Sequence, residues 1–241
     1  MRLTADVIGE AATFINTVKD RELDLRGLNI PAIENLGATK DLNDTLDLTD
    51  NDIRQITNFP YLPRLKHLFL SNNRISRIDA QAAKYLPNLL TLMLTNNQIN
   101  ELGDLESLSA FKNLQYLSLL DNPVTKKKHY RLWTISKLPK LRVFDFRKVK
   151  AAERKEALEL FGQEGKETTL AKELNDTKSK TFEPTVEEPK SNLPTMGLTP
   201  QEQQRIRDSI KQAKSLDEIT MLEKMLQSGQ IPEAQKQRLG L

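Results

Sequence analysis

The stretch that decides the fold is RLKHLFLSNNRISRI, residues 64–78, whose apolar residues follow neither strand alternation nor helical spacing. Three leucines, one asparagine and two isoleucines stand at these positions: Leu65, Leu68, Leu70, Asn73, Ile75 and Ile78. An asparagine at a fixed offset from three leucines is unusual in an isolated strand. The stretch therefore indicates a structure in which this asparagine occupies a specific structural position.

The same pattern returns along the chain. It recurs over residues 43–56, 89–102 and 114–124, and degenerate copies cover 21–33 and 141–149. The second apolar strand residue of each copy stands at position 25, 48, 70, 94, 119 or 146, so the step is 22 to 27 residues. This is the pattern L-x-x-L-x-L-x-x-N-x-L of leucine-rich repeats, at its usual period. The sequence predicts an α/β leucine-rich repeat solenoid.

The spacing has a physical reason. Each repeat is a short strand and a return segment, and one repeat alone cannot bury its apolar side. Strand alternation points the L-x-L pair inward, and stacked repeats place a curved parallel sheet on the concave face. The asparagine can satisfy backbone groups that no strand ladder reaches, so we interpret the following residues as scaffold: Asn51, Asn73, Asn97 and Asn122.

The repeats need covered ends, and the chain continues beyond them. We predict a helical N-terminal cap over 1–20, repeats over 21–125, a C-terminal cap over 126–165, a disordered linker over 166–198 and a helical hairpin over 199–232. Helical periodicity over 2–18 and a helix over 150–161 support the two caps.

The linker has scattered charge, three prolines and few apolar residues, with a short helix expected near 167–175. Two capping boxes mark the hairpin, at Thr199 with Glu202 and at Ser215 with Glu218. Because the hairpin has too small a core to be stable alone, we expect it to dock on a partner or on the solenoid.

Composition excludes several function classes. The chain has no cysteine, so disulfides and thiolate metal sites are absent. No secretory signal and no membrane-spanning apolar run occur, so we expect a soluble, intracellular protein without a membrane role. With two histidines and no phosphate loop or nucleophile elbow, we expect neither an enzyme nor a cofactor. The net charge of +3 is too small to indicate nucleic-acid binding by itself.

Function is expected on the residues that flank the inward leucines, because these point out of the concave sheet. The candidate protein-binding residues are Glu22, Asp24, Asp47, His67, Phe69, Met93, Tyr116, Ser118 and Leu120. They predict an apolar patch in the middle and later repeats beside an acidic rim, a surface that suits a basic amphipathic helix. Exposed apolar residues also occur without a function, which is the alternative interpretation.

A second candidate set is basic and lies in the C-terminal cap. It consists of Lys126, Lys127, Lys128, Arg131, Lys148 and Lys150. Such a run is ordinarily a solvated loop. Here the positive charge is local and aromatic residues interleave with it, so we also consider contact with an RNA backbone, which would not depend on base sequence.

Residues 21–39, 101–108 and 122–154 closely resemble the A-prime proteins of the spliceosomal U2 small nuclear ribonucleoprotein. The resemblance covers about residues 1–165 and implies a nuclear, non-enzymatic splicing factor. It further implies that the concave face grips a helix in the RNA-recognition domain of the B-double-prime protein, and that the pair binds a stem-loop of U2 small nuclear RNA. Other spliceosomal proteins would then bind the C-terminal tail.

One alternative from another class stays open at this point. A leucine-rich repeat regulatory or adaptor subunit, of a phosphatase or of the cytoskeletal machinery, would use the same concave face. It would bind its protein target without RNA.

Overall fold

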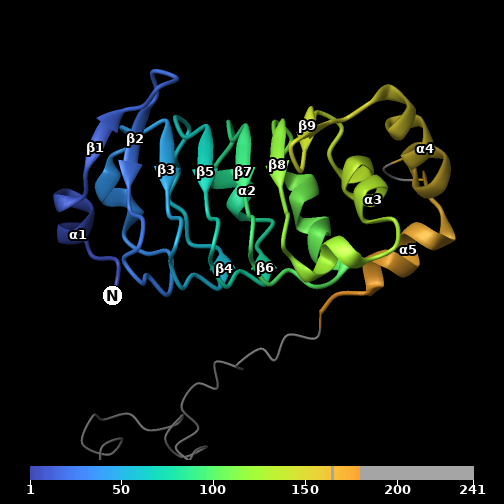
Figure 1. Cartoon of the computed structure of the whole chain (residues 1–241), viewed down its shortest axis with the longest axis horizontal. Helices are drawn as coiled ribbons and strands as arrows, with labels where there is room; N and C mark the ends of the chain where they lie inside the picture. Colours follow the sequence, from blue (N-terminus) through green and yellow to red (C-terminus); the bar gives the residue numbers. More distant parts are fainter. Residues whose placement is uncertain (164–165, 180–241) are drawn as a thin grey trace, which may run out of the picture. The chain divides into compact units, whose positions relative to one another are not determined.

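The computed structural model describes residues 1–163 and 166–179. The repeat strands run in series across one face, from blue to yellow in Figure 1. The strands are β1 (Thr13–Ile15), β2 (Arg21–Asp24), β3 (Thr45–Asp47), β4 (Gln55–Ile56), β5 (His67–Phe69), β6 (Arg77–Ile78), β7 (Thr91–Met93), β8 (Tyr116–Ser118), β9 (Val143–Phe144), β10 (Arg147–Lys148), β11 (Gly162–Gln163) and β12 (Lys166–Glu167). The α-helices are α1 (Ala5–Glu10), α2 (Ala82–Tyr85), α3 (Tyr130–Lys137), α4 (Ala151–Phe161) and α5 (Thr169–Asp176), and the 3₁₀ helices are η1 (Leu36–Thr39), η2 (Leu102–Ala110) and η3 (Pro123–Lys126).

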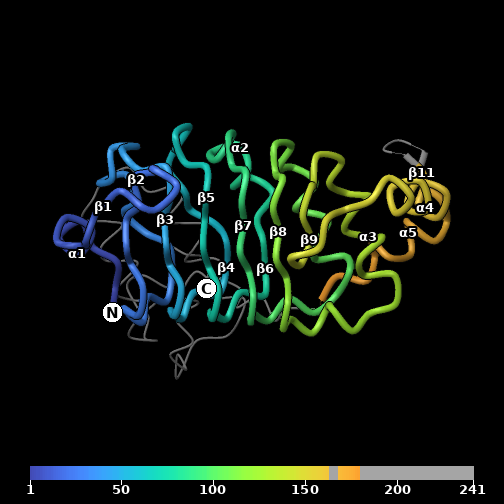
Figure 2. Tube along the Cα trace, turned by 45° about the horizontal axis from the view of Figure 1, so that its top comes forward, coloured from blue at the N-terminus to red at the C-terminus, as the bar shows by residue number. Residues whose placement is uncertain are grey.

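In the described residues, one sheet of eight strands has the order β1-β2-β3-β5-β7-β8-β9-β10. The strands from β2 to β9 pair in parallel, and only the two edge strands pair antiparallel. The small pair β4 and β6 lies on the return segments, away from this sheet (Figure 1). Figure 2 shows the helices α3 to α5 gathered at the end of the repeats. The predicted leucine-rich repeat solenoid, with a curved parallel sheet on its concave face, is confirmed.

The inward leucines of each repeat form one continuous core. Both leucines of the L-x-L pair are buried in every repeat from β2 to β8, and the isoleucines of the turns are buried beside them. Stacking is what removes these side chains from water, because a single strand and its return segment have no opposite face to cover them.

The asparagine ladder joins each repeat to the one before it. Asn73 donates through Nδ2 to the carbonyl oxygens of Leu48 (2.9 Å) and Leu70 (3.1 Å), and its Oδ1 accepts from the amide of Ile53 (3.0 Å). The same arrangement occurs at Asn51, Asn97 and Asn122. The residue before each of these asparagines has a positive φ of 54° to 58° and is always Asp or Asn, the residue types that best tolerate this conformation. The scaffold interpretation of the asparagines therefore agrees with their contacts.

The N-terminal cap differs from the predicted helix over 2–18. The helix extends only from Ala5 to Glu10, and the chain then forms β1, which pairs antiparallel with β2. Phe14 and Ile15 are exposed, at 41% and 65% of their surface. The reason is that β2 is the first parallel strand, and β1 satisfies the backbone groups along its open edge.

The C-terminal cap also departs from the repeat pattern. Asp145 and Phe146 have positive φ angles of 51° and 59°, so the chain turns after β9 and returns as β10. Phe146, expected as an inward residue of the last copy, is consequently 68% exposed. Trp133 is fully buried, and its Nε1 donates to the carbonyl oxygen of Leu102 (2.8 Å).

Ordered structure extends into the region predicted as a disordered linker. The helix α5 occupies 169–176, close to the short helix expected at 167–175, and the Thr168 side chain accepts a hydrogen bond from the amide of Ala171 (3.3 Å). Ala171 is buried in the core, which explains why this helix belongs to the cap. The remainder of the predicted linker and the predicted hairpin at 199–232 lie outside the described residues.

Candidate protein-binding surface

The predicted rows of outward-pointing residues form across the sheet. The first row is Glu22, Thr45, His67, Thr91, Tyr116 and Val143, each paired in register with the next. The second row is Asp24, Asp47, Phe69, Met93 and Ser118. The strand register places the members of each row side by side on neighbouring strands, and Thr45 and Thr91 of the first row are buried.

The apolar part of this surface spans three neighbouring strands. Phe69 and Met93 are direct neighbours on β5 and β7, and both are half-buried. Tyr116, at the start of β8, and Leu120, after its end, are 38% and 37% exposed. Groups that keep this much accessible apolar surface on adjacent strands are suited to burial against a partner.

Two of the predicted contact residues are themselves buried. Asp47 is only 7% exposed, and its Oδ1 accepts a hydrogen bond from the amide of Thr49 (2.9 Å). Ser118 is 1% exposed, and its hydroxyl lies 2.9 Å from that of Thr95. Because both side chains are buried and bonded within the sheet surface, these two residues support the surface rather than form it.

The predicted acidic rim is a network of ion pairs. Arg26 pairs with Asp24 at 2.7 Å and lies 3.7 Å from Asp47. The hydrogen bond from Arg26 is the main cause of a lowered pKa of Asp24. Arg26 therefore offsets part of the negative charge that the sequence predicted for this rim.

Asp44 is the centre of a second group of charges at the edge where the parallel strands begin. It pairs with Arg64 and Lys66, both at 3.1 Å, and its Oδ2 accepts a hydrogen bond from the backbone amide of Arg21 (3.2 Å). Burial alone would raise the pKa of Asp44, but these hydrogen bonds outweigh it and lower the pKa to about 2. Asp44 therefore fixes the positions of two cations at this edge.

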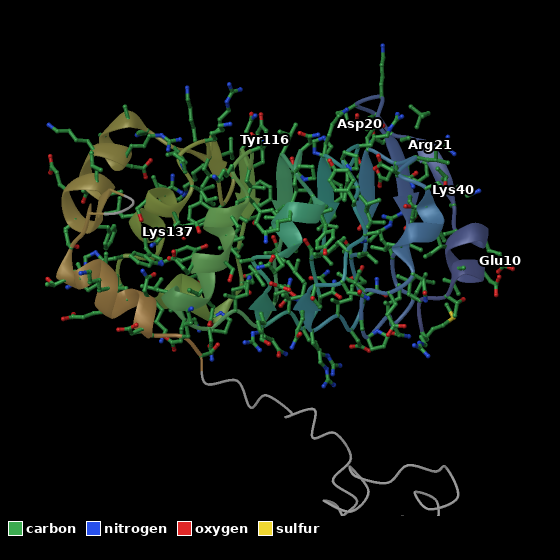
Figure 3. The ribbon with its side chains drawn as sticks, turned by 180° about the vertical axis from the view of Figure 1, so that it is seen from behind. Glu10, Asp20, Arg21, Lys40, Tyr116 and Lys137 are labelled. Atoms are coloured by element: carbon green, nitrogen blue, oxygen red, sulfur yellow. The ribbon has the colours of Figure 1, made fainter. Side chains whose placement is uncertain are left out.

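His67 is held in place from both ring nitrogens. Its Nδ1 lies 2.8 Å from the hydroxyl of Thr91, and its Nε2 lies 3.3 Å from Oδ2 of Asp20. Burial lowers the pKa of His67, and the nearby Asp20 carboxylate offsets only part of that effect. Figure 3 shows Asp20 at the same edge as Arg21 and Tyr116. Asp20 was not among the predicted site residues, because the pattern assigned it to the cap.

The predicted basic set divides into exposed and engaged members. Lys126, Lys128, Lys148 and Lys150 are exposed, and Lys127 is exposed as well but pairs with Glu101 at 2.6 Å. Arg131 is half-buried, pairs with Glu153 at 2.6 Å and donates to the carbonyl oxygen of Phe144 (3.0 Å). Arg131 therefore joins α3 to α4, and it is not a free cation of the surface as predicted.

The same ion pair brings the two ends of the basic set near each other. Arg131 also donates to the carbonyl oxygen of Lys148 (3.5 Å), and Glu153 accepts a hydrogen bond from the amide of Lys150 (2.8 Å). Arg131 and Glu153 thus hold the backbone that carries Lys148 and Lys150. Lys127 is not part of this group, because it pairs with Glu101.

The leucine-rich repeat family matches residues 1–175. The human U2 small nuclear ribonucleoprotein A' is 49% identical over 237 residues, which covers 96% of this chain and 90% of the human protein. The same-named protein of Schizosaccharomyces pombe is 44% identical over 239 residues, covering 97% of this chain and all of the yeast protein.

The chain belongs to the U2 small nuclear ribonucleoprotein A' family.

A solved structure supports the membership in three dimensions. The crystal structure of the Drosophila melanogaster SNF/U2A' complex contains a chain that is 48% identical and matches with a TM-score of 0.67. The match covers 73% of this chain and 98% of that one. This chain is accordingly a leucine-rich repeat subunit of the spliceosomal U2 small nuclear ribonucleoprotein, and like its family it is a non-enzymatic scaffold.

In residues 1–163 and 166–179, no three carboxylate or histidine side chains gather closely enough to hold a metal ion. Within the same residues, no helix is long and apolar enough to cross a membrane.

Proposed function

We propose that this U2 A' family member binds the RNA-recognition domain of the B-double-prime protein through the concave sheet, and that it assists the binding of that protein to a stem-loop of U2 small nuclear RNA in the nucleus. The observation that carries the proposal is the apolar group of Phe69, Met93 and Tyr116 on three consecutive strands. A helix laid across the strands would bury these side chains together.

The surroundings of this group support a specific partner. Arg26 with Asp24, and Lys66 with Asp44, place fixed charges of both signs at the N-terminal side of the apolar group. Ion pairs at the rim of an interface contribute little affinity but select among partners and set orientation. The Drosophila melanogaster relative was crystallised in a complex with SNF, which supports a protein partner for this chain.

The experiment is calorimetric titration of the B-double-prime RNA-recognition domain into the full chain and into the Phe69→Ala, Met93→Ala double variant. We expect affinity to fall at least about tenfold, because buried aromatic and Met side chains dominate interface energies. The Tyr85→Ala variant is the control, since Tyr85 is 46% exposed on α2, outside the sheet. Unchanged affinity in the double variant would refute the assignment of the surface.

We further propose that Lys148 and Lys150 contact the RNA backbone when the partner is bound. Both are exposed, and Arg131 and Glu153 hold the backbone beside them. Charge reversal at both positions should weaken RNA binding by the protein pair and reduce its salt dependence, while the affinity between the two proteins stays the same. Equal RNA affinity and equal salt dependence in the variant would exclude this contact.

A further inference from the structure

A cavity of about 610 Å³ opens in the C-terminal cap among η2, α3, α4 and the start of α5. No residue of the eight-stranded sheet lines it. Its size lies within the range of about 300 to 1,000 Å³ that is usual for ligand pockets. A ligand in this cavity would therefore leave the proposed partner surface free.

The inner wall of the cavity is apolar. Trp133, Phe161 and Ala171 line it and are almost fully buried, and the Trp133 and Phe161 rings meet edge to face at 5.1 Å. The Trp133 Nε1 is already bonded to the Leu102 carbonyl oxygen, so no polar atom of the indole is left unsatisfied. Leu158 also lines the cavity and is 44% exposed. The wall is suited to one large apolar side chain.

The residues around this wall carry an excess of positive charge. Lys112, Lys137, Lys140 and Arg154 line the cavity, and Glu106 is the one carboxylate among the lining residues. Lys137 pairs with Glu106 at 2.6 Å and lies 4.5 Å from the centre of the Trp133 ring. Figure 3 shows Lys137 among the helices of this cap. Lys112, Lys140 and Arg154 have no carboxylate partner among the lining residues, although Lys140 donates to Oδ1 of Asn113 (2.8 Å) and Arg154 donates to the carbonyl oxygen of Leu141.

We propose that this cavity binds an acidic linear segment of a protein partner, which inserts one large apolar side chain between Trp133 and Leu158. Carboxylates on either side of that apolar residue would meet Lys112 and Lys140, both of which are exposed. Apolar burial supplies the attraction, and the charges select an acidic partner over a neutral or basic one.

The test uses the full chain and its single tryptophan, Trp133, as the reporter. The probes are short synthetic peptides with one central Leu, Ile, Met or Phe between runs of Glu, and binding is followed by Trp133 emission and by calorimetry. We expect at least one peptide to bind saturably, with a Kd below about 100 μM. The same peptide with Gln in place of Glu, or with Ala in place of the apolar residue, should bind at least about tenfold more weakly.

Two matched variants complete the test. The Lys112→Glu, Lys140→Glu variant should weaken the acidic peptide at least about tenfold. The Lys126→Glu, Lys128→Glu variant reverses two exposed cations outside the cavity and should leave the affinity unchanged. Both variants should keep the melting temperature and the B-double-prime affinity of the wild type, which separates this proposal from the proposed function.

Three results would overturn the proposal. The first is the absence of saturable binding by every peptide in both measurements. The second is equal binding of the Glu and Gln peptides, which would indicate a plain apolar cavity. The third is concentration-dependent self-association in sedimentation equilibrium that the acidic peptide does not reverse, which would indicate a second copy of the chain as the occupant.

Discussion

At the scale of single residues, Asn73 shows how the scaffold is held together. It is 7% exposed and bonds to backbone groups of its own repeat and of the preceding repeat. Asn73→Ala would leave these buried groups unsatisfied, and we expect it to lower the free energy of unfolding by about 2 to 4 kcal/mol. Urea denaturation measures this, with Gln98→Ala as an exposed control in the next repeat. A loss no larger than that of the control would contradict the account.

His67 gives the surface a pH dependence. Burial lowers the pKa of His67 in the folded chain below the unfolded value near 6.5. The unfolded chain then binds more protons than the folded chain as the pH falls through and below 6.5, so stability falls with it. We expect the wild type to lose more stability than His67→Gln between pH 7 and pH 5.5, measured by urea denaturation. Equal losses in both proteins would contradict the burial argument.

At the scale of elements, the position of α5 depends on one glycine of η2. A Cβ at Gly103 would lie 2.8 Å from the carbonyl oxygen of Asn175 and 3.1 Å from that of Leu174, both in α5. Gly103→Ala should push α5 away and lower the free energy of unfolding by about 1 to 3 kcal/mol. Amide hydrogen exchange should show faster exchange in α5.

The matched control is Gly37→Ala in η1, where an added Cβ meets nothing within 4 Å. This variant should be close to neutral in stability and should not alter exchange in α5. If the two glycine variants behave alike, α5 is not packed on η2 as the structure has it.

A second prediction at this scale concerns the connection of α3 to α4. Arg131 pairs with Glu153, and the hydrogen bond from Arg131 is the main cause of a lowered pKa of that carboxyl. Arg131→Met keeps much of the apolar stem, so the loss of stability should be about 1 to 2 kcal/mol. Thermal unfolding with Lys126→Met as the exposed control checks this. If Arg131→Met and Lys126→Met lower the stability equally, Arg131 does not join α3 to α4.

The periodicity of the sequence predicted the structure of the repeats but not the structure of the caps at their ends. The L-x-L pair determines which residues face inward. The residues beside it, from Glu22 to Tyr116 in the first row and from Asp24 to Ser118 in the second, are therefore in register on neighbouring strands. The cap strand β1 was missed because its Phe14 and Ile15 fit a helical spacing as well, and only the open edge of β2 decides between the two. The open edge of β2 occurs only once in the solenoid, so a pattern that repeats along the chain cannot predict how it is covered.

The candidate site was predicted by position and not by exposure. Strand alternation predicts that Asp47 and Ser118 point out of the sheet, but both side chains are buried. Asp145 is also partly buried in the structure. Burial raises its pKa, although Leu119 and Tyr130 donate hydrogen bonds to its carboxylate. These contacts join residues that are 15 to 26 positions apart, and no local pattern encodes them.

At the scale of the whole molecule, the described residues offer two separate surfaces. The sheet carries the apolar group of Phe69, Met93 and Tyr116, and the C-terminal cap carries the basic cavity around Trp133. A scaffold subunit without chemistry of its own acts by binding, so two surfaces with no shared residue allow it to hold two partners at once.

The central claim is that the B-double-prime domain lies on the concave sheet, and site-specific photo-cross-linking tests it most directly. The cross-linking residue p-benzoylphenylalanine is placed in the full chain at Phe69 on β5 or, as the control, at Tyr85 on α2. We expect a cross-link to the B-double-prime domain from position 69 and none from position 85. A cross-link from position 85 without one from position 69 would contradict it.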